Sequence, residues 1–186
     1  MVEEREVVDA LVACGAVRFG SFTLASGAKS DYYVDIKKAS TRADTLALLG
    51  RHIARHAKRY DRVAGMELGA VPLVVAAALA AEKPLLIVRK QAKAHGVEGR
   101  IIGDYAPGER VLVVEDVTTT GSSSVEAIRV LRTAGLVVDT CVTVVDRESG
   151  AEKAFEQENV VLVALARARD LMVAKGADGA SREADR

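Results

Sequence analysis

The sequence contains no tryptophan, only two cysteines and three prolines, and no excess of either charge. Cys14 and Cys141 stand alone in apolar surroundings, so we expect reduced thiols and neither a disulfide nor a cysteine metal site. Lysine and arginine number 26 together, as do aspartate and glutamate. Because general nucleic-acid binding needs a basic surface, this balance argues against a nucleic-acid partner.

Long hydrophobic runs are also missing. The longest, Val71–Ala81, stops at a charged pair and is shorter than the roughly 20 residues that cross a bilayer. The residues that follow Met1 are mostly charged, unlike a secretory signal. We therefore expect a cytoplasmic protein with no membrane contact. With 186 residues and 49% hydrophobic residues, the chain can form one domain with its own core.

Apolar spacing along the chain alternates between the periods of helices and strands. We expect helices over residues 3–14, 42–59, 71–81, 122–133, 151–157 and 167–174, and strands over 19–24, 32–36, 62–66, 85–88, 111–115, 137–145 and 160–165. This alternation predicts an α/β fold with a central, mostly parallel sheet flanked by helices. A single domain should cover residues 1–175, and residues 176–186 should form a frayed tail.

The segment Val111–Ser124 carries the clearest functional signal. Four apolar residues lead into two acids, a hydroxyl-rich turn follows, and then a helical pattern begins. This order is typical of a buried parallel strand whose carboxyl end meets a helix N-terminus, where free N–H groups bind phosphate. Gly121 lets the backbone approach a ligand closely. The neighbouring hydroxyl donors are Thr118, Thr119, Thr120, Ser122 and Ser123.

The two acids, Glu115 and Asp116, would repel a phosphate and so need another role. Hydrogen bonds to sugar hydroxyls, or help in holding a metal ion, would both fit. Together with the phosphate-binding turn, they indicate a site for a phosphorylated ribose. The alternative is an ordinary strand followed by a capped helix.

A basic loop follows the expected strand 85–88. Arg89, Lys90, Lys93 and His95 fall within seven residues, in a loop that also contains several glycines. Long loops in compact domains are often lids or binding loops, and this one has the charge to cover a polyanion. A solvated basic loop with no such role is the alternative.

Two further turns follow expected strands. In Met66–Pro72, a glycine and a proline at a helix start suit either a second phosphate loop or a plain tight turn. At the end of strand 137–145, Arg147 could form paired hydrogen bonds with a carboxylate or imide. It could equally pair with Glu148 at the surface.

His52 and His56 are four residues apart on an expected helix, which is the spacing of a zinc pair. No third ligand accompanies them in the sequence. We expect both side chains on the helix surface, with no role in metal binding.

Four segments in this order resemble the orotate phosphoribosyltransferases, which are type I phosphoribosyltransferases. The segments are Phe19–Tyr33, Arg89–Gly96, Val114–Ser122 and Asp146–Arg147. The resemblance covers roughly residues 17–150; many phosphoribosyltransferases share the third segment, whereas the first two are more particular to the orotate enzymes. It implies the type I fold, with a small N-terminal hood and a mobile lid loop.

The implied reaction transfers the 5-phosphoribosyl group from phosphoribosyl diphosphate (PRPP) to orotate in pyrimidine (UMP) biosynthesis, with Mg²⁺. The products are orotidine 5′-monophosphate and diphosphate. No metal should be held by the protein alone. The resemblance places Glu115 and Asp116 on the ribose hydroxyls and assigns Lys93 to the reacting groups with them. It places the 5′-phosphate at Thr118, Thr119, Thr120, Gly121, Ser122 and Ser123, the diphosphate at Arg89, Lys90, Lys93 and His95, and orotate at Thr119, Arg147, Tyr32 and Tyr33. Val117 is counted among the PRPP-binding residues as well.

The chain departs from familiar bacterial members of this group, which have lysines where it has Ala25 and Gly69. Similar enzymes are homodimers in which the lid covers the neighbour's site, and we expect the same here. Two other functions stay open: a phosphoribosyltransferase for another base, and a PRPP-binding transcriptional regulator of the same fold. The regulator would need a helix-turn-helix, and only one helix is expected before Phe19.

Overall fold

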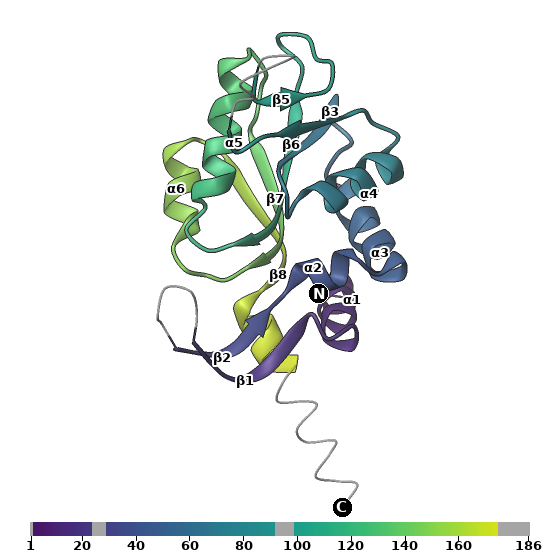
Figure 1. Cartoon of the computed structure of the whole chain (residues 1–186), viewed down its shortest axis with the longest axis vertical. Helices are drawn as coiled ribbons and strands as arrows, with labels where there is room; N and C mark the ends of the chain where they lie inside the picture. The colour runs from purple at the N-terminus through teal and green to yellow at the C-terminus, as the bar shows by residue number, and fades with distance from the viewer. Residues whose placement is uncertain (1, 24–28, 92–98, 175–186) are drawn as a thin grey trace, which may run out of the picture.

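The computed structural model describes residues 2–23, 29–91 and 99–174. Its centre is a six-stranded sheet with the order β5-β4-β3-β6-β7-β8 (Figure 1). All neighbouring strands are parallel except the short edge strand β5, which pairs antiparallel with β4. The strands are β3 (Arg62–Met66), β4 (Leu85–Val88), β5 (Ile101–Ile102), β6 (Val111–Thr118), β7 (Thr140–Asp146) and β8 (Val161–Arg167). The predicted α/β fold with a mostly parallel sheet is confirmed.

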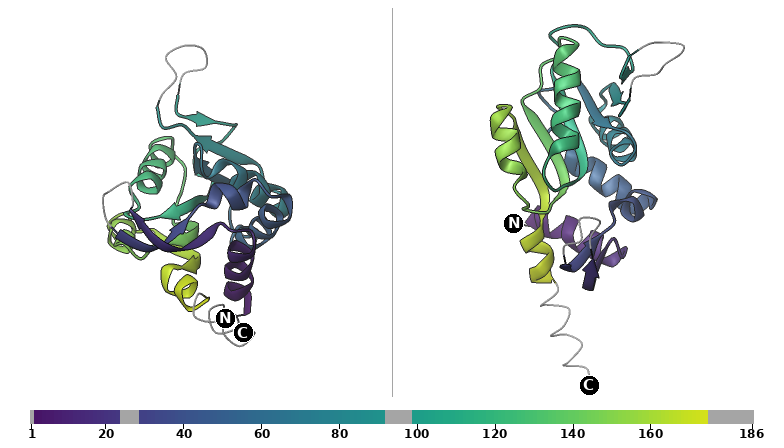
Figure 2. Two further views of the ribbon diagram at one scale, coloured as in Figure 1. Left: turned by 60° about the horizontal axis from the view of Figure 1, so that its bottom comes forward. Right: turned by 60° about the vertical axis from the view of Figure 1, so that its left-hand side comes forward.

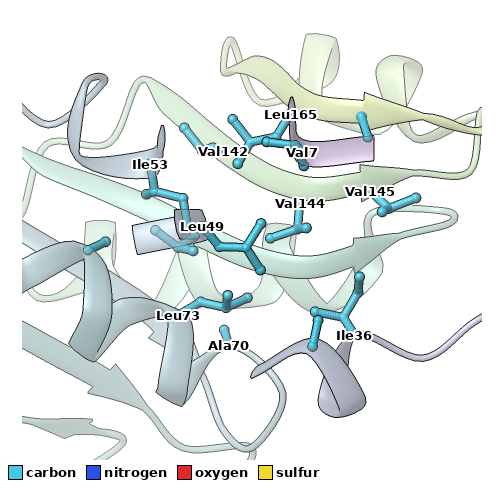
Figure 3. Close-up of a cluster of buried hydrophobic side chains, with 14 of the residues drawn as sticks. Val7, Ile36, Leu49, Ile53, Ala70, Leu73, Val142, Val144, Val145 and Leu165 are labelled. Carbon is cyan, nitrogen blue, oxygen red and sulfur yellow. The ribbon is translucent and has the colours of Figure 1, made fainter. Parts of the chain in front are cut away.

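Helices cover both faces of this sheet. One face packs against α1 (Val2–Ala13), α3 (Ala43–Ala54) and α4 (Val71–Ala81), and the other against α5 (Ser122–Thr133) and α6 (Ala151–Gln157). Figure 3 shows the first of these cores, where Leu49, Leu73 and Val144 converge from α3, α4 and β7. Two buried cores, one on each side, hold the sheet rigid, so that its carboxyl edge can position side chains.

A small hood lies at one end of the sheet. It consists of the antiparallel ribbon β1 (Val17–Thr23) and β2 (Lys29–Val34) together with the short helix α2 (Ile36–Ser40). Figure 2 (left) shows the ribbon crossing in front of the sheet. The predicted N-terminal hood is therefore present. The predicted lid and the predicted C-terminal tail fall largely on residues 92–98 and 175–186, which lie outside the described residues.

Several boundaries differ from the sequence-based expectations. The strand that was expected to stop at Glu115 continues to Thr118, because Val117 and Thr118 pair with Val145 and Asp146 of β7. Ile36 begins α2 instead of ending a strand. Ile101 and Ile102, expected in a loop, form β5. The longer β6 and the short β5 arise from pairing with β7 and β4, which local spacing does not reveal.

The expected surface position of His52 is wrong. Its side chain is buried beside Leu49 and Ile53 of α3, and its Nε2 lies 2.9 Å from Glu6 Oε2 of α1. Among the described residues, no three His, Cys, Asp or Glu side chains cluster as a metal site. None of the helices in the described ranges is long and apolar enough to cross a membrane.

Candidate active site

The strand order reverses between β3 and β6, and this switch point is where open α/β sheets bind ligands. From β3 the chain first adds β4 and β5 on one side, and then crosses to β6 on the other. The loop after β3, Glu67–Ala70, and the end of β6 therefore lie side by side. A Cβ atom on Gly69 would lie only 2.3 Å from Asp116 Oδ2, so the two segments are in contact.

The two acids of β6 point to opposite faces of the sheet, because both belong to the strand and side chains alternate along it. Asp116 faces the Glu67–Ala70 loop, where its Oδ2 lies against Gly69. Glu115 faces α5, where its Oε2 accepts a hydrogen bond of 2.7 Å from Ser124 Oγ. The sequence presented them as an adjacent pair, and the strand separates them into two environments.

Glu115 is almost completely buried, and this burial raises the pKa of its carboxyl to about 7. The hydrogen bond from Ser124 acts in the opposite direction and lowers the pKa of Glu115, while the nearby charge of Asp116 raises it. The Glu115 carboxylate is thus held in a largely apolar setting by few polar partners.

The predicted phosphate-binding segment follows directly. We call Thr119–Ser123 the phosphate turn; its hydroxyl-bearing side chains are exposed. Gly121 has a φ of 79°, and a Cβ there would lie 2.9 Å from the ring of Phe155, so no other residue fits without strain. No side chain caps the α5 N-terminus, which leaves its N–H groups directed at the turn.

Thr118 differs from the other hydroxyl residues of the motif. Its side chain is 1% exposed, and its hydroxyl has no hydrogen-bond partner. The extension of β6 places it inside the sheet beside Asp146. Its backbone carbonyl accepts a hydrogen bond of 2.9 Å from the Arg147 N–H, so Thr118 connects the phosphate turn to the end of β7.

Arg147 lies beneath the hood. Its guanidinium is 5.0 Å from the centre of the Tyr32 ring, and its Nη2 donates a hydrogen bond of 3.3 Å to Ser30 Oγ. Tyr33 points to the opposite face of β2, where it packs against Phe22 and Arg18. Of the two predicted tyrosines, the structure brings only Tyr32 to Arg147, since neighbouring residues of a strand alternate.

The basic loop begins at the same edge. Arg89 is half-buried and Lys90 is exposed, and the Lys90 N–H donates a hydrogen bond of 2.9 Å to Glu67 Oε1. The predicted residues Lys93 and His95 lie outside the described residues, as does Ala25. Glu67 was not identified from the sequence, although its place directly after a strand was the available signal.

Ser124 was also missed by the sequence-based reasoning. It shares a helix face with Ile128 and Leu131, at spacings of four and seven residues, which marks it as a buried hydroxyl rather than a member of the exposed turn. That spacing could have identified it as a partner for a strand residue below α5.

Comparison with known proteins places this geometry in a family. The phosphoribosyl transferase domain model matches residues 36–163. An orotate phosphoribosyltransferase from Methanosarcina mazei is 51% identical over 172 residues, which cover 91% of this chain and 92% of that protein.

Solved structures of orotate phosphoribosyltransferases are similar to this chain in fold. The orotate phosphoribosyltransferase from Aeropyrum pernix has a TM-score of 0.81 at 32% identity, covering 91% of this chain and 98% of that one. The Mycobacterium tuberculosis enzyme in complex with PRPP has a TM-score of 0.74 at 34% identity, with the same two coverages. The fold, the order of motifs and these relatives together show that the chain belongs to the orotate phosphoribosyltransferase family.

Proposed function

We propose that this protein transfers the 5-phosphoribosyl group from PRPP to orotate, with the chemistry taking place at the carboxyl edge of β3, β6 and β7. The observation that carries the proposal is the meeting of three features at that edge: the acids of β6, the exposed phosphate turn, and Arg147 beneath the hood. A phosphorylated sugar needs the first two, and a planar acidic base needs the third.

PRPP binding would divide between the two sides of the switch point. The 5′-phosphate fits the phosphate turn, because free N–H groups and four exposed hydroxyl side chains surround it. Asp116 on one face of β6 and Glu115 on the other would accept hydrogen bonds from the ribose hydroxyls. The diphosphate would contact the Glu67–Ala70 loop and the basic loop through Arg89 and Lys90. Lys93 and His95 are also predicted to contact the diphosphate, and both lie outside the described residues.

The reaction is then an electrostatic problem. The bond between C1 of the ribose and the diphosphate oxygen breaks as N1 of orotate forms a bond to C1, and positive charge grows on the ribose ring. The proton of N1 is released to the diphosphate or to water. The carboxylate of Asp116 stabilises the positive charge on the ring, and Glu115 adds to it in its deprotonated form, while cationic side chains stabilise the leaving diphosphate. No side chain needs to act as a covalent nucleophile.

Mg²⁺ fits this site as a companion of the substrate. The described residues offer no cage of three or more ligands, and hard cations readily keep water and phosphate oxygens as ligands. We infer that Mg²⁺ would bind together with PRPP, largely through oxygens of the substrate and water, and would supply positive charge to the leaving diphosphate. Asp116 at the open side of β6 is the carboxylate of the chain best placed to support it.

A base-substrate panel tests the function. Purified protein should consume orotate only when both PRPP and Mg²⁺ are present, and should release diphosphate in equal amount. Uracil, adenine and hypoxanthine serve as competing bases. Unchanged orotate absorbance alongside consumption of a purine would assign the chain to another base.

Arg147 provides the sharpest test of the base site. Arg147→Ala should raise the KM for orotate roughly 10- to 100-fold, because a charge-assisted paired hydrogen bond is lost, while the KM for PRPP changes little. Arg147→Lys keeps the charge but loses the paired hydrogen-bond geometry. Its KM for orotate should therefore lie between those of the wild type and Arg147→Ala. The matched control is Arg129→Ala. Arg129 is an exposed arginine of α5 that forms an ion pair with Glu158. Equal increases for both substrates would remove Arg147 from the base site.

We also propose that the protein is a homodimer that uses the outer face of α4. This helix is apolar all round, and Val75 and Leu79 remain exposed on it, as does Leu68 in the preceding Glu67–Ala70 loop. Contiguous apolar side chains on a surface are typical of interfaces. A two-fold contact here would bring each Glu67–Ala70 loop to the neighbouring subunit and allow the basic loop to reach the neighbour's site.

Leu79→Glu should convert the dimer to monomers in sedimentation experiments, because it places a charge in the contact. Val161→Glu, at an equally apolar exposed position on the edge strand β8, should leave the mass of the assembly unchanged. A wild-type protein that sediments as a monomer at micromolar concentration contradicts the proposal.

A further inference from the structure

Ser124 is a buried hydroxyl residue beside the predicted PRPP site, and its side chain points inward onto Glu115. It lies in the first turn of α5, directly after the phosphate turn, and is 2% exposed. Its Oγ donates a hydrogen bond of 2.7 Å to Oε2 of Glu115. We propose that Ser124 is a positioning residue that fixes the Glu115 carboxylate relative to the phosphate turn. The inference rests on the proposed function of this site.

Among the described residues, two groups donate hydrogen bonds to the Glu115 carboxylate, and they come from different elements. Oε1 accepts the N–H of Asp116 at 3.1 Å, within β6 itself. Oε2 accepts the Ser124 hydroxyl, which is the bond that joins β6 to α5. The side chain is therefore anchored to the strand at one oxygen and to the helix at the other, which leaves it a single orientation.

The choice of residue supports a role in positioning. Position 124 belongs to the buried face of α5, where Ile128 and Leu131 are apolar, so an alanine would fit and would bury no polar group. An alanine would, however, leave Oε2 without a donor in a buried setting, which is costly for a carboxylate. Cys141 of β7 is fully buried nearby, and burial raises the pKa of its thiol, so it stays neutral and is a weak donor.

The consequence is a link between two parts of PRPP recognition. The phosphate turn forms the N-terminus of α5, and Ser124 belongs to the same helical turn. With the 5′-phosphate bound at that turn, the Ser124 hydroxyl would hold the Glu115 carboxylate in position for the ribose hydroxyls. The phosphate subsite and the ribose subsite are thereby set at a fixed separation, as efficient transfer requires.

The test is a double-mutant cycle. PRPP affinity is measured by calorimetry without orotate, and kcat and KM are measured with both substrates, for wild type, Ser124→Ala, Glu115→Gln and the double variant. Ser124→Ala should weaken PRPP roughly tenfold and leave the KM for orotate within about twofold. In the Glu115→Gln background, Ser124→Ala should reduce the PRPP affinity much less, because the charged acceptor of the Ser124 hydrogen bond is gone.

Further variants separate positioning from stability. Ser124→Thr keeps the hydroxyl and should recover most of the PRPP affinity, whereas Ser124→Cys keeps a similar volume with a poor donor and should not. Ser40→Ala removes an equally buried serine hydroxyl, bonded to the Lys37 carbonyl in α2, and should change thermal stability without changing PRPP binding.

Wild-type PRPP affinity in both Ser124→Ala and Ser124→Cys would overturn the inference. So would an equal loss of PRPP affinity on Ser124→Ala in the Glu115→Gln background. A folded Ser124→Thr protein that does not recover PRPP affinity would also overturn it. If the wild-type protein binds PRPP but consumes another base, the proposed function fails. The cycle measured by calorimetry still decides the role of Ser124.

Discussion

Asp116→Asn is expected to lower kcat roughly 10- to 100-fold, since it removes one charge that faces the reacting sugar. The carboxylate of Asp116 accepts the Val117 N–H at 2.7 Å through Oδ1, while Oδ2 lies against the Glu67–Ala70 loop. Asparagine has the same shape and can keep the bond from Val117. The free energy of unfolding should therefore change by less than about 1 kcal/mol.

A matched control lies at the opposite edge of the sheet. Asp61 Oδ2 also accepts a single backbone N–H, that of Arg110, at 2.7 Å. Asp61→Asn makes the same chemical change far from the site and should leave kcat at the wild-type value. Stopped assays for orotidine 5′-monophosphate and thermal melts measure both variants. If Asp116→Asn keeps its full turnover number, this acid only ends a strand.

Gly69→Lys is expected to lower kcat/KM for PRPP on the order of a hundredfold, although it adds a cation beside the proposed diphosphate subsite. The physical reason is the contact with Asp116. A Cβ at Gly69 would lie 2.3 Å from Asp116 Oδ2 and 2.8 Å from its Cγ, so the carboxylate has to move. The backbone of Gly69 does not adopt a positive φ, so strain in the main chain is not involved.

Gly69→Ala isolates this effect, because it adds the Cβ without the charge, and should cause most of the loss. In an Asp116→Asn background the further loss from Gly69→Ala should be small, because the displaced group has already lost its charge. Steady-state kinetics on the four proteins measure the coupling. A Gly69→Lys protein with improved PRPP affinity would show that Asp116 can move at no cost and that a cation is missing from this loop.

Local patterns were sufficient where an element depends on its own residues. The bounds of β3, α4, β4, α5 and α6 agree with the expected ranges, because short apolar runs between polar turns define them. The ordered motifs also led to the correct family, since phosphate turns, paired acids and basic loops are contiguous in sequence. The roles assigned to individual side chains remain predictions that the variants above test.

Other features depended on contacts between distant segments. The sequence gives no sign that β6 continues to Thr118, because that extension requires pairing with β7. The same extension decides that Glu115 and Asp116 face opposite sides of the sheet. His52 is buried for a similar reason, since α1 packs over a face of α3 that spacing alone leaves open.

The fold class, the family and the segments that form the site could be predicted from the sequence, because each is encoded in spacing and in the chemistry of adjacent residues. Which side chains within those segments meet depends on how the elements pack in three dimensions. This packing joins Arg147 to Tyr32 rather than Tyr33, sets Asp116 against Gly69, and gives Glu115 a partner in Ser124. Strand register and helix docking fix these pairs, and both depend on packing between elements that are far apart in the chain.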